Sequence, residues 1–61
     1  MKMRTALVRS ENGLSIKRYE DYRSNEEFAY DLRANGFKVL KIWASYKTDA
    51  EVDAWEFEHR K

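Results

Sequence analysis

The segment from residue 24 to residue 36 carries helix signals at both of its ends, and no other stretch constrains the fold as tightly. Ser24, followed three residues later by Glu27, matches a capping box. At the other end Asn35-Gly36 supplies a left-handed stop. Phe28, Ala29 and Leu32 form an apolar face between these signals. The pattern predicts a helix over about 25–35.

A β-hairpin is predicted before this helix. Residues 3–9 are rich in strand formers, and residues 14–19 alternate apolar with polar side chains. Asn12-Gly13 lies between the two runs, and this pair is the strongest short-range hairpin signal because both residues tolerate positive φ.

A third strand is predicted over residues 37–46, because both of its faces are apolar, as in a central strand. One side of the sheet should lie beneath Phe28 and Leu32 of the helix. The residues expected there are Leu14, Ile16, Leu40 and Ile42.

The C-terminal segment supports two interpretations. Thr48 and Glu51 match a second capping box, which favours a helix. On a helix, however, Val52 and Trp55 would lie opposite the other apolar residues, whereas residues 53–59 alternate as a strand does. We prefer a strand over 50–59. The predicted fold is therefore α+β, with the order ββαββ and one helix packed on one face of a mostly antiparallel sheet. Residues 1–61 should form a single compact domain without linkers.

Composition excludes several classes of protein. The chain has no Cys, so disulfides and zinc–thiolate sites are ruled out. Its 12 basic and 11 acidic residues give a net charge of +1, which by itself predicts neither a nucleic-acid nor a membrane partner. No apolar run approaches the length of a membrane span, and we expect a cytoplasmic protein.

Catalytic and metal chemistry find little support in the residues. The single histidine, His59, is close to the chain end, where we expect a solvated side chain. Asp49, Glu51 and Asp53 resemble the start of a calcium loop, but Ala54 occupies the position that needs glycine. The two glycines are accounted for by a turn and a helix end, so no phosphate loop remains. We expect no enzyme, no metal and no cofactor.

Aromatic residues are the best indication of a binding surface. Two Trp, four Tyr and three Phe make up 15 % of a chain that can enclose only a thin core. These residue types are enriched at the centres of protein interfaces. We expect a small accessory or regulatory protein, such as the inhibitors that short phage genes encode. It should bind another protein stoichiometrically through an aromatic sheet face and its acidic elements, and the same face could form a homodimer. The predicted partner-binding residues are Tyr19, Tyr30, Val39, Trp43, Trp55 and Phe57.

The alternative is a module that binds single-stranded nucleic acid. Residues 1–23 carry six basic and three acidic side chains, whereas residues 48–61 sum to −3. Basic strands could hold phosphates while aromatic rings stack on bases. The cations predicted for that role are Arg4, Arg9, Lys17, Arg18, Lys38 and Lys41.

Overall fold

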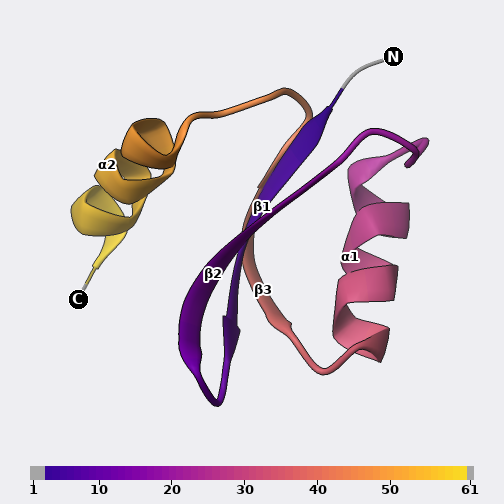
Figure 1. Ribbon diagram of the computed structural model, residues 1–61, viewed down its shortest axis with the longest axis horizontal. Coiled ribbons are helices and arrows are strands. Elements are labelled where there is room, and N and C mark those ends of the chain that lie inside the picture. Colours follow the sequence, from indigo (N-terminus) through magenta and orange to yellow (C-terminus); the bar gives the residue numbers. More distant parts are fainter. Residues whose placement is uncertain (1–2, 61) are drawn as a thin grey trace.

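The computed structural model describes residues 3–60, which form a three-stranded antiparallel sheet and two helices. The elements are β1 (Arg4–Ser10), β2 (Gly13–Tyr19), α1 (Asn25–Ala34), β3 (Lys38–Trp43) and α2 (Asp49–His59). The strand order is β2-β1-β3, so β1 is central and the other two are edge strands. The two helices lie on opposite sides of the sheet (Figure 1). Within the described residues, neither helix is both long and apolar enough to cross a membrane.

The predicted order ββαββ was wrong, because the segment assigned to a fourth strand forms the helix α2. The α+β class is retained. The Thr48–Glu51 capping box is present in full: the Thr48 hydroxyl accepts from the Glu51 amide, and the Glu51 carboxylate accepts from the Thr48 amide. The distribution of apolar residues over two sides of this segment had favoured a strand, but it does not prevent a helix. Val52 and Trp55 face the sheet together, whereas Phe57 is left 70 % exposed.

The helix α1 begins and ends close to where its signals placed it. The Ser24 hydroxyl accepts from the Glu27 amide, although the Glu27 carboxylate accepts from the Arg23 amide and not from that of Ser24. Gly36 has φ of 90°, and the Phe37 and Gly36 amides donate to the carbonyls of Leu32 and Arg33. This is a Schellman motif, which closes the helix and turns the chain into β3.

The hairpin of β1 and β2 was also predicted, but its turn has a different geometry. Ser10 pairs with Gly13, and within the described residues only the two glycines have positive φ. Asn12 therefore has a negative φ, and in this turn only Gly13 has a positive φ, of 106°.

A bulge in β3 decides which side chains lie beneath α1. Leu7 pairs with Lys41 but Val8 pairs with Val39, so Leu40 has no partner on β1. Because of this extra residue, Val39 and Ile42 lie on the same side of the sheet. They pack there against a core of Ala6, Val8, Phe28 and Leu32. The prediction that Leu14 and Ile16 lie beneath α1 was wrong, because both line the other face, under α2.

The α2 face of the sheet has its own buried side chains. Leu7 and Val52 are buried, and Trp43 packs edge-to-face on Trp55 with ring centroids 5.8 Å apart. Thr5 is fully buried, and its hydroxyl donates to the Ser45 carbonyl and accepts from the Lys47 amide. These two bonds attach the β3–α2 connection to the central strand.

Val52 tests whether α2 is an integral part of the fold. Its side chain is fully buried, so we expect Val52→Ala to lower the free energy of unfolding by about 2 kcal/mol, through lost burial and a residual cavity. Chemical denaturation followed by far-UV circular dichroism measures this change. Phe57→Ala on the exposed side of the same helix is the control, expected to change stability by about 0.5 kcal/mol or less. Equal effects of the two substitutions would contradict the docking of α2.

Candidate functional site

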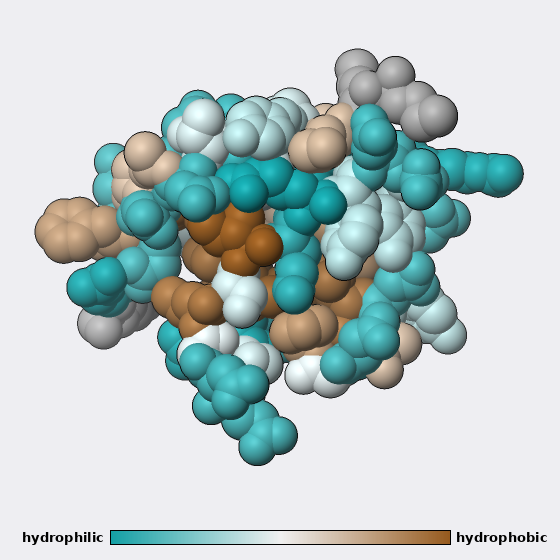
Figure 2. Space-filling model, in the orientation of Figure 1, coloured by the Kyte–Doolittle hydropathy of each residue, from teal (hydrophilic) through white to brown (hydrophobic). Residues whose placement is uncertain are grey.

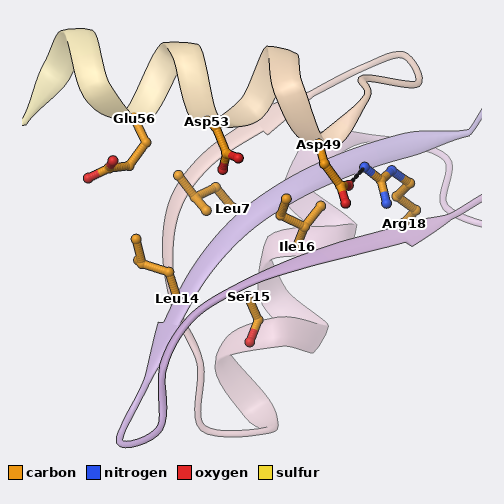
Figure 3. A pocket seen from close by; sticks show the side chains of 8 residues that line it. All are labelled: Leu7, Leu14, Ser15, Ile16, Arg18, Asp49, Asp53 and Glu56. Carbon is orange, nitrogen blue, oxygen red and sulfur yellow. Dashed lines mark hydrogen bonds and ion pairs between the residues drawn. The ribbon is translucent and has the colours of Figure 1, made fainter.

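A groove lies between α2 and the edge strand β2, with a volume of about 360 Å³. We call it the α2–β2 groove. Its lining residues are Leu7, Leu14, Ser15, Ile16, Arg18, Asp49, Asp53 and Glu56. The carboxylates of α2 point down toward the strands, and Leu7, Leu14 and Ile16 point up toward the helix (Figure 3). The space-filling view shows hydrophobic side chains in a hollow bordered by hydrophilic ones (Figure 2). The groove thus has an apolar floor and an acidic wall.

The spacing of the α2 residues explains why the wall is acidic. Asp49, Asp53 and Glu56 are four and three residues apart, so they lie along one flank of the helix. Val52 and Trp55 occupy the adjacent flank and anchor it to the sheet. The docking of the apolar flank therefore directs the carboxylates over β2.

Arg18 determines where the first turn of α2 lies. Its guanidinium donates twice to the Lys47 carbonyl, at 3.1 Å and 2.9 Å, and forms an ion pair with Asp49. The same group lies 5.1 Å from the centre of the Tyr46 ring. Because Arg18 is on β2 and its partners precede or begin α2, these bonds close one end of the groove.

The carboxylates of the wall differ in how far they are already paired. Glu56 accepts from Arg60 at 2.5 Å and 3.2 Å, and this bond, with the nearby charge of Arg9, lowers the pKa of Glu56. Asp49 is paired with Arg18. Within residues 3–60 no ion pair engages Asp53, which is exposed and lies over Leu7, between Leu14 and Ile16 (Figure 3). Asp53 is the carboxylate available to a partner.

A second hollow, of about 320 Å³, lies on the other side of β2, next to α1. We call it the α1–β2 hollow. Its lining residues are Lys17, Tyr19, Tyr22, Asp31, Leu32, Asn35 and Phe37. Tyr22 stacks on Phe28 with centroids 4.8 Å apart, and Tyr19 meets both rings edge-on. The ammonium group of Lys17 lies 4.9 Å from the centre of the Phe37 ring.

The six residues predicted to bind a partner do not share one sheet face. Trp43 and Trp55 are partly buried against each other between β3 and α2, and Tyr19 lies on the α1 side. Val39 and Tyr30 line a hollow between β3 and α1, and Phe57 is exposed on α2. The expected aromatic sheet face is occupied by α2, which makes Trp43 and Trp55 packing residues in the described structure.

His59 is part of this packing. Its ring stacks on Trp55 at 4.3 Å, and its Nδ1 lies 2.9 Å from the Trp55 carbonyl oxygen. Across residues 3–60, no three acidic or histidine side chains lie close enough together to hold a metal ion.

The six cations of the nucleic-acid alternative are also dispersed. Arg4 donates to the Tyr22 and Arg23 carbonyls and to Asn25, so it fixes the chain before α1. Arg18 is engaged with Lys47 and Asp49, as described above. Arg9 lines a hollow beside Trp55, and Lys38 and Lys41 are exposed on β3. A helix lies on each side of the sheet (Figure 1), and within the described residues these six cations do not flank one shared sheet face.

Leu14, Ile16, Asp49, Asp53 and Glu56 were not among the predicted site residues. The signal for them was present in the capping box at Thr48. A helix starting there places the three carboxylates on one flank, and the strand pattern places Leu14 and Ile16 on one face.

Comparisons of this chain with protein-family models, curated proteins and solved structures found no match in any of the three.

Arg18 offers a test of how the groove is closed. Arg18→Met keeps the aliphatic stem but removes the donors to Lys47 and Asp49, so we expect a loss of about 1–2 kcal/mol in the free energy of unfolding. Chemical denaturation measures it. Lys38→Met, an exposed cation on β3, should change stability little. If both variants unfold at the same denaturant concentration as the wild type, Arg18 does not hold α2.

Tyr22 gives a pH-dependent prediction. Its hydroxyl donates to Asp31 at 2.8 Å, and this bond, together with burial, raises the pKa of Tyr22 from 10.0 to about 12. A raised pKa means that the folded state holds the proton more tightly. The stabilisation is therefore complete below about pH 10 and is lost as the pH rises towards 12.

We expect Tyr22→Phe to be less stable than the wild type by about 1 kcal/mol near neutral pH, with the difference shrinking above pH 10. Denaturation of both proteins across this range isolates Tyr22, because every other titrating group is shared. A constant difference at all pH values would contradict the hydrogen bond to Asp31.

Proposed function

We propose that this chain is a small, non-enzymatic accessory protein that binds another protein stoichiometrically through the α2–β2 groove. The observation that carries this proposal is the pairing of the exposed Leu14 and the partly exposed Ile16 with carboxylates in one concave surface. Leu14 is 44 % exposed although it is a large aliphatic residue, and Asp53 lines the same groove. An apolar centre with a charged border is the usual composition of a protein-binding surface.

The charge of the groove selects the kind of partner. Three carboxylates and one guanidinium line it, so it favours a segment that carries positive charge and apolar groups together. Long cationic side chains meet both needs, because their stems can cover Leu14 and Ile16 while their ends reach Asp53. A homodimer through this groove is disfavoured because it would bring together the Asp53 carboxylates of two copies, which no ion pair engages within residues 3–60.

The same surface suits a regulator better than a catalyst. The floor is aliphatic, and two of the three carboxylates are already paired with arginines. A chain bound through this groove would cover a basic segment of its partner and keep that segment from other contacts, as a small stoichiometric inhibitor does.

Charge reversal on α2 tests the proposal. Asp53→Lys places a cation in the groove, and Glu58→Lys makes the same change on the same helix outside it. Both residues are exposed, so both variants should fold. We expect a tagged wild-type chain to capture one protein from a lysate of its organism, in an equal molar amount. The Asp53→Lys chain should capture about tenfold less of this protein, and the Glu58→Lys chain should capture as much as the wild type.

Nuclease treatment and light scattering distinguish the other outcomes. Recovery that vanishes with nuclease would favour the nucleic-acid alternative. A wild-type dimer that Asp53→Lys dissociates would make a second copy the occupant of the groove. Equal capture by all three chains would reject the α2–β2 groove as the binding site.

A further inference from the structure

The edge strand β2 has an open side between two hollows. In the order β2-β1-β3, and among the residues that the structure describes, it pairs with β1 only, over seven consecutive residue pairs and without a bulge. In an antiparallel pair, alternate residues direct their N–H and C=O groups away from the partner strand. Half of the backbone groups of β2 therefore point outward along this edge.

A hollow separates each helix from this edge. The α2–β2 groove opens on one side of β2, and the α1–β2 hollow opens on the other. Leu14, Ile16 and Arg18 line the first, whereas Lys17 and Tyr19 line the second. Because side chains alternate along a strand, the same strand edge forms part of both hollows.

The opposite edge of the sheet is protected in a way that β2 is not. The strand β3 contains the bulge at Leu40 and exposes Lys38 and Lys41, and bulges and edge lysines both discourage strand pairing. The cations of β2 are engaged within the chain instead, Arg18 with the Lys47 carbonyl and Lys17 with the Phe37 ring. The edge of β2 is therefore the one suited to accept a strand.

We propose that the partner binds as an extended strand that pairs with β2 and lengthens the three-stranded sheet, with cationic side chains toward α2 and apolar side chains toward α1. This inference rests on the proposed function and names its binding mode. Strand addition obtains affinity from backbone hydrogen bonds and specificity from pockets for alternate side chains.

The two hollows determine which side chains fit on each face of the added strand. On the α2 side a cationic side chain covers Leu14 and Ile16 and reaches Asp53. On the α1 side Tyr19 and Phe37 offer apolar contact beside the polar side chains that line the rest of the hollow. The occupant is therefore a segment of another protein in which Lys or Arg alternates with apolar residues.

The probe is a synthetic peptide of seven residues, the length of β2, in which lysine alternates with valine. A glutamate–valine peptide is the charge control. Two further lysine–valine peptides are methylated on backbone amide nitrogens. One is methylated at every lysine residue and the other at every valine residue. In a paired strand only one of these two sets of amides faces β2, so only one methylated peptide should lose binding.

We expect the lysine–valine peptide to bind, with altered amide shifts and slowed hydrogen exchange at alternate residues of β2. Affinity should fall at least tenfold for the glutamate–valine peptide, for one methylated peptide and for Asp53→Lys, whereas Glu58→Lys should bind like the wild type.

Two results would overturn the strand model. One is the absence of binding by the lysine–valine peptide, and the other is equal binding of both methylated peptides. If a protein is nevertheless captured from lysate in a manner sensitive to Asp53→Lys, the proposed function stands and only the binding mode fails. If the lysine–valine peptide does not bind and no protein is captured in a manner sensitive to Asp53→Lys, the proposed function and the strand-pairing mode are both wrong.

Discussion

The structure depends on the burial of the central strand β1 on both of its faces. Thr5, Ala6, Leu7 and Val8 are all buried, so consecutive side chains that point to opposite sides of the sheet are each covered. A single helix can cover only one side. The second helix is therefore required to bury Leu7 and Thr5, and a fourth strand at the sheet edge would leave them exposed.

The docking of α2 also creates the candidate site. The bonds of Thr5 and Arg18 to residues 45–49 fix the start of the helix, and Val52 and Trp55 fix its rotation. With that rotation, the acidic flank lies over Leu14 and Ile16. The groove is thus a consequence of core packing, because the residues that close the sheet also set the position of Asp53.

Much of the fold could be predicted from local signals, but the meeting of α2 with β2 that forms the site could not. Gly13 and Gly36 act through their own positive φ, and the Ser24 hydroxyl accepts from the Glu27 amide three residues along. The helix and the hairpin therefore followed from residues close together in the sequence. The partner-binding prediction assumed strict alternation in β3 and a strand at 50–59. The bulge at Leu40 broke the alternation, and α2 placed Trp43 and Trp55 against each other. Both events depend on contacts between residues far apart in sequence.

The sequence by itself determined the first hairpin, the limits of α1, the start signal of α2 and the absence of cysteine chemistry. These properties depend on a few adjacent residues or on composition alone. Only the tertiary structure decided which flank of α2 is buried, which side of the sheet carries Leu14 and Ile16, and whether the cations are engaged. The physical reason is that the burial of Val52 and the partial burial of Trp55 against the sheet outweigh the exposure of Phe57, and that comparison requires the sheet to be in place.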